Sequence, residues 1–201
     1  MFRPTPVLVA IAFSLFIPAI AAAQDNVVLF GGYSYSRPPV TVAESCNLCA
    51  QALAVEVTNN RNLNGWEFSG TYRFLPFLGL AADFSGHYGA SVSGSSSSVH
   101  QQDYLFGPEV SLPRNISPFA HVLFGDSHQS IGAGPAPGTG GAYSILAGST
   151  SGFATAVGGG IDLKLISHMW VRPIQIDYMV TRLHGGTQNQ PRVSAGLVLH
   201  F

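Results

Sequence analysis

Two groups of side chains in this 201-residue chain have residue types and a spacing that could support chemistry. The first is the pair Cys46 and Cys49, the only two cysteines. In an intracellular enzyme a C-x-x-C pair is typical of a redox or metal site, but a metal site would need two further ligands and the sequence places none nearby. In an exported protein the same pair favours a local disulfide. We predict a loop disulfide between Cys46 and Cys49.

The second group is the run Asp126-Ser127-His128, which contains the residue types of a hydrolytic triad. Adjacent residues of a strand point to opposite faces, so this contiguity argues against a triad. The other histidines are scattered without the spacing of metal ligands. The Gly-rich stretch GAGPAPGTGG neither follows a strand in a βαβ unit nor leads into a helix, which argues against a phosphate loop. We therefore predict no metal, no cofactor and no catalytic site.

The composition limits the classes of protein to which the chain can belong. Charged residues make up 9% of it, against about 25% in ordinary globular domains. The formal net charge is −1, so no basic surface predicts binding to nucleic acid. The length suits one domain.

The first 23 residues are predicted to be a secretory signal peptide. Arg3 is followed by an apolar run, and the small residues Ala21 and Ala23 form an A-x-A cleavage pattern. We expect cleavage between Ala23 and Gln24, which leaves residues 24–201 as the mature domain. No later stretch reaches the roughly 18–20 apolar residues of a membrane-spanning helix.

The mature chain alternates apolar and polar residues with a period of two, which indicates strands. In the segment 64–74, Trp66, Phe68 and Tyr72 fall on one face, opposite Glu67 and Arg73. Eight such segments are predicted, at 26–36, 64–74, 77–88, 103–112, 117–126, 152–163, 169–180 and 192–201. The fifth alternates too weakly to say which face is apolar. In the seventh, Arg172 breaks the parity beside Pro173, which predicts a β-bulge or an irregular strand start.

The connections between these segments alternate in length. Short connections follow the second, fourth and sixth segments, and longer ones rich in Gly, Ser and Pro cover 37–63, 89–101, 127–151 and 181–192. We expect the longer ones to be loops. An even number of strands puts both ends of the chain on the side of the short turns. Short periplasmic turns and long external loops are typical of outer-membrane barrels, whereas a soluble sandwich has no reason for this asymmetry.

The predicted fold is therefore all-β, an eight-stranded antiparallel up-and-down transmembrane β-barrel, with aromatic residues near the segment ends where a membrane interface would lie. An eight-stranded barrel is just wide enough to be filled by side chains. Buried charges must be paired, so we expect a polar network in the lumen, strongest near the periplasmic end. Glu67, Arg73, Asp83, Glu109, Asp162 and Asp177 point inward by parity, and Arg172, which starts its strand at the level of Arg73, Glu109 and Asp162, joins them.

Several stretches resemble a known family. The final SAGLVLHF alternates through Leu197 and Leu199 to Phe201 and resembles the C-terminal signature of bacterial outer-membrane proteins. The stretches LFGGYSYSR, GWEFSGTYRF, AVGGGIDLKL and VRPIQIDYMVTRLHGG, in this order, resemble the small OmpA-like or OmpX-like outer-membrane β-barrel domain over nearly all of residues 25–201. The resemblance implies a place in the outer membrane of a Gram-negative bacterium and recognition of the C-terminal signature by the barrel-assembly machinery.

We predict a monomer in the outer-membrane lipid bilayer with a structural or surface-interaction role, performed by external loops that contact an unknown extracellular partner. One alternative is a lipid-modifying enzyme, which predicts altered lipid A that Ser127→Ala or His128→Ala abolishes. A second is a narrow channel, which predicts single-channel steps sensitive to Arg73→Ala or Glu109→Ala. A third is a soluble periplasmic barrel that binds an apolar ligand.

Overall fold

The computed structural model describes residues 26–46, 54–90, 98–136, 143–183 and 186–201. The predicted signal peptide, residues 1–23, and Cys49 lie outside these ranges. Within them no helix is long and apolar enough to cross a membrane.

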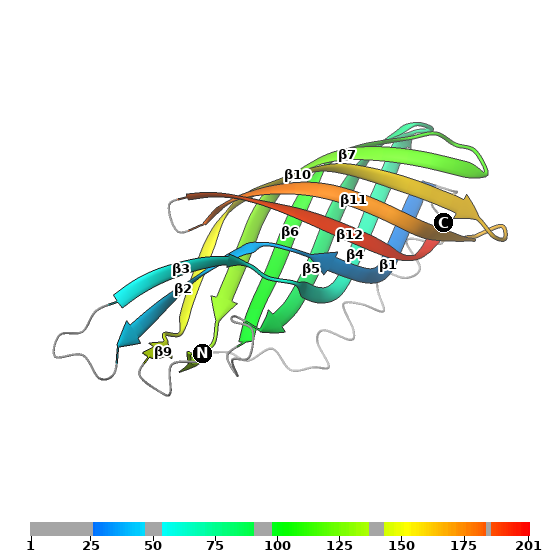
Figure 1. Cartoon of the computed structure of the whole chain (residues 1–201). Helices are drawn as coiled ribbons and strands as arrows, with labels where there is room; N and C mark the ends of the chain where they lie inside the picture. The colour runs from blue at the N-terminus through cyan, green and yellow to red at the C-terminus, as the bar shows by residue number, and fades with distance from the viewer. Residues whose placement is uncertain (1–25, 47–53, 91–97, 137–142, 184–185) are drawn as a thin grey trace, which may run out of the picture.

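Eight antiparallel strands form a closed barrel, which confirms the predicted fold class. Each strand pairs with its neighbour along the barrel, and β1 closes the ring against β12 (Figure 1). The barrel strands are β1 (Val27–Ser36), β4 (Leu63–Leu75), β5 (Leu78–Ala90), β6 (Ser98–Ser111), β7 (Ile116–Ile131), β10 (Gly148–Lys164), β11 (Met169–Leu183) and β12 (Gly186–His200). Closure pairs Phe30 with Val198 and leaves no open edge in the ring.

The apolar face of each strand points outward. The exposed large side chains form a belt around the barrel, among them Trp66, Phe68, Tyr72, Phe84, Tyr104, Phe106, Phe124, Phe153, Ile176, Tyr178 and Leu197. In water such a belt would be a large exposed apolar patch, whereas in a bilayer it is the surface that meets lipid. The soluble periplasmic barrel is thus disfavoured, because its apolar residues would have to pack inward.

The structure shows which side chains of the weakly alternating fifth segment, 117–126, point into the lumen and which point outward. On β7, Phe119, His121 and Leu123 point into the lumen, and Val122 and Phe124 point outward. On β11 the pairing with β12 shifts register between Arg172 and Gln175, as the predicted bulge at Arg172-Pro173 requires.

The predicted loops are shorter than expected. Four additional strands, β2 (Pro39–Cys46), β3 (Ala54–Asn60), β8 (Gly134–Pro135) and β9 (Tyr143–Ile145), form a second sheet in the order β3-β2-β9-β8, here called the external sheet. Figure 1 shows β2, β3 and β9 extending beyond the barrel at the end opposite the C-terminus. The prediction of loops at 37–63 and 127–151 is therefore wrong.

The hairpin of β11 and β12 also corrects the predicted loop at 181–192. Thr181 pairs with Gln188 and Leu183 with Gly186, so both strands continue beyond the expected ends. The predicted loop at 89–101 is likewise too long at its C-terminal end, because β6 already begins at Ser98. In each case backbone hydrogen bonds to the neighbouring strand keep a polar, Gly-rich sequence extended.

Candidate functional site

The candidate site is the interior of the barrel, because the strands alternate with a period of two and send their polar residues inward. The fully buried Arg192 lies at its centre on β12. Its Nη1 donates to Asp83 Oδ1 at 2.7 Å and its Nη2 to Asp177 Oδ2 at 2.6 Å. A third carboxylate, Glu67 Oε2, lies 3.5 Å from its Nε. One guanidinium thus joins carboxylates from β4, β5 and β11 across the lumen.

Towards the short turns, Arg172 forms a second centre. It donates twice to Asp162, from Nε at 2.7 Å and from Nη2 at 3.0 Å. Its guanidinium carbon also lies 4.4 Å from the ring centroid of Phe30 and 4.0 Å from that of Phe119. A planar guanidinium suits this combination of bidentate pairing and ring stacking. Arg172 therefore reaches from β11 to side chains of β1, β7 and β10 at this level.

Gln175 links the two arginine centres. Its Oε1 accepts from Arg172 Nη1 at 2.6 Å, and its Nε2 donates to Glu67 Oε1 at 2.7 Å. The same Nε2 donates to Asp177 Oδ2 at 2.8 Å. On the neighbouring strand Gly158 leaves room for this carboxylate, because a Cβ there would collide with Asp177. The ionic groups are thus one connected network.

Towards the external sheet the network continues as neutral groups around the buried Asp103. Ser127 Oγ donates to Asp103 Oδ1 at 2.6 Å, and Gln101 Nε2 donates to the same oxygen at 3.0 Å. Ser85 connects this group to the centre, since its hydroxyl accepts from Arg192 Nη1 at 3.1 Å and donates to Asp103 Oδ2 at 3.2 Å. The Ser127 side chain therefore points into the lumen, where it is hydrogen-bonded to Asp103.

The structure brings most of the predicted lumen residues together. Glu67, Asp83, Asp162, Arg172 and Asp177 belong to the connected network, as the contacts above show. Glu109 reaches it through His121, whose Nδ1 lies 3.9 Å from Glu109 and whose Nε2 lies 2.9 Å from Asp177. Arg73 is half-buried at the mouth of the barrel, where Glu109 and Asp162 attract it electrostatically without forming one of the ion pairs above.

Sequence reasoning missed Arg192. It fell at the boundary between a predicted loop and the last strand, after Pro191. The signal was nonetheless present, because Gln188, Gln190 and Ser194 share its parity and all of them are buried. Extending the alternation backwards through TQNQPRVS would have placed Arg192 inside.

A cluster of buried apolar residues covers the external mouth of the barrel. Val40 and Val42 of β2 and Ile145 of β9 pack against Leu63, Val99 and Ile131 at the external ends of β4, β6 and β7. This mouth cluster attaches the external sheet to the barrel. The sheet is therefore a fixed extension of the fold and holds a defined surface outside the membrane.

The run Asp126-Ser127-His128 is divided between two faces, as the alternation of a strand predicts. Ser127 points inward, whereas His128 points outward and its Nδ1 lies 2.7 Å from Ser151 Oγ on β10. The contiguous run thus forms no triad. Within the described residues, no group of three or more His, Cys, Asp or Glu side chains could hold a metal ion. Cys46 ends β2, and its predicted disulfide to Cys49 stays a prediction.

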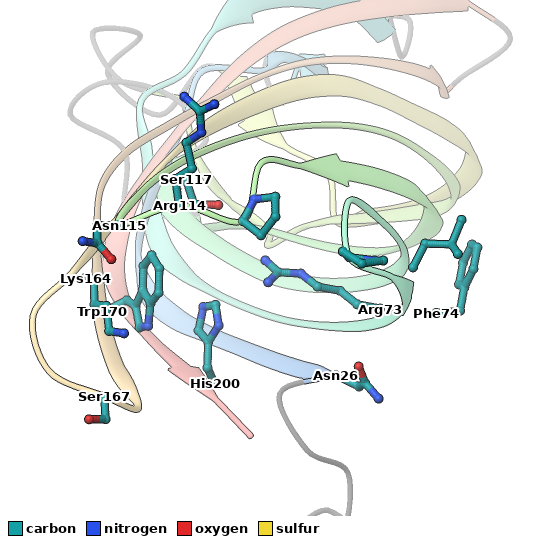
Figure 2. Close-up of a pocket in the computed structure, with 13 residues that line it drawn as sticks. Asn26, Arg73, Phe74, Arg114, Asn115, Ser117, Lys164, Ser167, Trp170 and His200 are labelled. Carbon is teal, nitrogen blue, oxygen red and sulfur yellow. The ribbon is translucent and has the colours of Figure 1, made fainter.

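The periplasmic mouth holds a basic pocket of about 450 Å³, here called the vestibule. Figure 2 shows Arg73 reaching across the opening, with Trp170 and His200 on the wall beside it. Arg114 and Lys164 also line it, and none of its lining residues, all of them described, is Asp or Glu. Arg73 Nε and the indole N–H of Trp170 have no hydrogen-bond partner in the described part of the chain. The vestibule thus presents donors and positive charge.

No protein-family model and no curated protein sequence matches the chain. Several solved structures, however, are similar to it. Neisserial surface protein A is similar with a TM-score of 0.59 and 10% identity, covering 88% of this chain and 97% of its own. OprG of Pseudomonas aeruginosa is similar with a TM-score of 0.53 and 10% identity, and the match covers 89% of this chain and 96% of OprG. Ail of Yersinia pestis, solved with the heparin analogue sucrose octasulfate, is similar with a TM-score of 0.52 and 16% identity. The match covers 86% of this chain and 97% of the Ail chain.

At these identities the similarity shows the fold. The chain has the fold of the small bacterial outer-membrane β-barrels, as the resemblance in its sequence implied. The predicted location in the outer membrane agrees with this fold and with the exposed apolar belt.

Proposed function

We propose that the chain is a non-catalytic outer-membrane barrel that presents its external sheet at the cell surface for interaction with an extracellular partner. The observation that carries this proposal is the mouth cluster, because it fixes β2 and β9 rigidly on the barrel. A preorganised surface loses less entropy on binding than a flexible loop. The lumen, filled by the network around Arg192, supports a role as scaffold.

The proposal also covers assembly. We propose that the chain inserts as a monomer and that the barrel-assembly machinery reads Leu197, Leu199 and Phe201. The outward facing of all three side chains supports this, because a residue that points to lipid is accessible to another protein before insertion is complete.

Binding at the cell surface tests the proposed role. Cells would display either the wild type or a variant in which residues 39–60 are replaced by a short Gly-Ser turn. A sulfated polysaccharide is the first probe, since Ail was solved with a heparin analogue, followed by matrix proteins and cells of the same strain. We expect at least one probe to bind the wild type and not the variant. Equal binding by both, at equal amounts of barrel in the outer membrane, would contradict the proposal.

A filled lumen should not conduct. We predict that the purified barrel gives no single-channel steps in a planar bilayer, because Arg172, Arg192 and their partners occupy the lumen. Steps of constant size that disappear in Arg73→Ala or Glu109→Ala would instead support a channel.

One observation bears on the second candidate function, an enzyme acting on lipid. His128 and Ser151 form an exposed hydrogen-bonded pair above the apolar belt, and a Ser–His pair is the minimal unit of nucleophilic catalysis. We predict no catalysis here, because the only acid beside the pair on the same face is Asp126 and no hydrogen bond joins it to His128 among the described residues. The mass spectrum of lipid A should therefore be the same with and without expression. A change that His128→Ala or Ser151→Ala abolishes, and Ser127→Ala leaves intact, would establish the enzyme.

A further inference from the structure

The wall of the barrel that faces lipid is hollowed near its periplasmic end. An apolar groove of about 400 Å³ lies between β6 and β7, lined by Phe77, Val110, Leu112, Pro118, Phe119 and Ala120. The groove exists because the outward-facing Ala120 is small and pairs with Gly159 of β10, which has no side chain, so the surface beside Val110 and Pro118 is left uncovered. An acyl chain is the apolar partner that a bilayer offers such a groove.

The turn between β6 and β7 connects this groove to the vestibule. Leu112 and Pro118 line the groove, whereas Pro113, Arg114 and Asn115 line the vestibule. The turn is held tightly, since Leu112 N donates to Pro118 O at 3.0 Å and Ser111 N donates to Phe77 O at 2.9 Å. An apolar site and a basic site thus share one rigid rim.

Two exposed cations, Arg114 and Lys164, lie on neighbouring segments of this rim. The backbone N–H of Lys164 donates to Asn115 O at 2.9 Å, which brings the end of β10 beside the turn that bears Arg114. Figure 2 shows Arg114, Asn115 and Lys164 on the same side of the mouth, with the side chains of Arg114 and Lys164 extending in different directions and Arg73 reaching across the opening. Because no acidic side chain lines the vestibule, the charge favours an anion. A phosphate suits Arg and Lys donors.

We propose that this rim binds one anionic phospholipid of the periplasmic leaflet. One acyl chain lies in the groove beside Ala120, and the phosphate is held by Arg114 and Lys164. The charge complementarity and the contact of the groove with the bilayer select a lipid over a soluble anion, which would use the vestibule alone. The proposal concerns the periplasmic end and is independent of the role of the external sheet.

Native mass spectrometry of the whole barrel tests the proposal. The barrel is released from mixed micelles that contain equal amounts of phosphatidylglycerol and phosphatidylcholine, and the bound lipid is counted. We expect one phosphatidylglycerol to be retained in preference. Each basic group near a membrane surface contributes about 1 kcal/mol, which is about a fivefold preference, so Arg114→Gln with Lys164→Gln should reduce the ratio of the two lipids about 25-fold.

Matched variants separate this site from general effects. Ala120→Leu fills the groove and should reduce retention of both lipids, whereas Ala195→Leu, exposed on β12, should not. Arg37→Gln with Arg182→Gln removes two exposed cations elsewhere and should leave the preference intact. Every variant is first checked for the gel-mobility shift of a folded barrel. The proposal would be overturned if the Arg114 and Lys164 variant kept the preference for phosphatidylglycerol, or if the Arg37 and Arg182 variant lost it equally. It would also be overturned if Ala120→Leu retained as much lipid as the wild type, or if inorganic phosphate displaced the lipid.

Discussion

Replacing Arg192 by methionine is expected to lower the free energy of unfolding by about 3–5 kcal/mol, the usual cost of removing one partner from a buried ion pair. The change leaves Asp83, Asp177 and Glu67 without their shared cation in the lumen. Methionine keeps much of the volume of arginine, so the loss of charge dominates. Urea unfolding in lipid vesicles, followed by the gel-mobility shift, measures the change.

Arg182→Met is the control for this prediction. Arg182 is an exposed arginine on the outer face of β11, so its loss should change stability by less than about 0.5 kcal/mol. Adding Asp83→Asn and Asp177→Asn to Arg192→Met should restore part of the stability, because two of the unpaired charges are then removed. Equal effects of Arg192→Met and Arg182→Met would show that the lumen network does not stabilise the barrel.

Leu63→Asp is expected to detach the external sheet while the barrel stays closed. Leu63 is fully buried in the mouth cluster, and an unpaired carboxylate there would cost several kcal/mol. We expect a loss of about 3 kcal/mol, confined to the sheet, which corresponds to more than a hundredfold faster amide hydrogen exchange in β2 and β9. Exchange in β6 and β11 should change little.

Asn59→Asp provides the comparison for the second prediction. Asn59 is an exposed residue of the external sheet, so the same new charge meets water and should not alter exchange in β2. If Leu63→Asp left exchange in β2 and β9 unchanged, the mouth cluster would not be what holds the sheet. The variant should also lose the binding proposed for the cell surface.

The barrel could be predicted from the sequence because its strands follow a local rule. Trp66, Phe68 and Tyr72 face lipid while Glu67, Ser69 and Thr71 face the lumen, so alternation alone assigns each residue to a face. The same rule survives at 10–16% identity to the structures with this fold, since it specifies polarity and not particular side chains. The number of strands and the lengths of the turns then predict which end faces the periplasm.

The external sheet could not be predicted in this way. β2 pairs with β9 through Glu44 and Ile145, about 100 residues apart in the chain, and β9 and β8 are too short to show any period. No short-range pattern of residues in a Gly- and Pro-rich sequence predicts such a pairing. Val40, Val42 and Ile145 acquire their burial only when the ends of β4, β6 and β7 come together beneath them.

The network was only partly predictable for a related reason. Parity tells that Asp83 and Asp177 point inward, but not which cation they share, because that depends on how far the strands are staggered around the ring. Arg192 was hidden by the polar run GTQNQPR and by Pro191, which is typical of a loop or a strand edge. Pro191 faces outward and has no N–H to donate to a neighbouring strand. Its carbonyl still accepts a hydrogen bond, from Arg37 N at 3.2 Å.

The central claim is that the barrel spans the outer membrane with its short turns in the periplasm and the external sheet outside. The chain contains a single lysine, Lys164, exposed at the end of β10 beside a short turn. Intact cells would be treated with a membrane-impermeant amine reagent, and modification of Lys164 measured by peptide mass spectrometry. A Thr58→Lys variant adds an amine on the external sheet.

We predict that in intact cells the amine at position 58 is modified and Lys164 is not, and that Lys164 becomes modified once the outer membrane is opened. Modification of Lys164 in intact cells, with the amine at position 58 protected, would mean that the barrel is inverted. Protection of both amines in intact cells and modification of both after opening would mean that the protein lies wholly in the periplasm. Either result would contradict the claim.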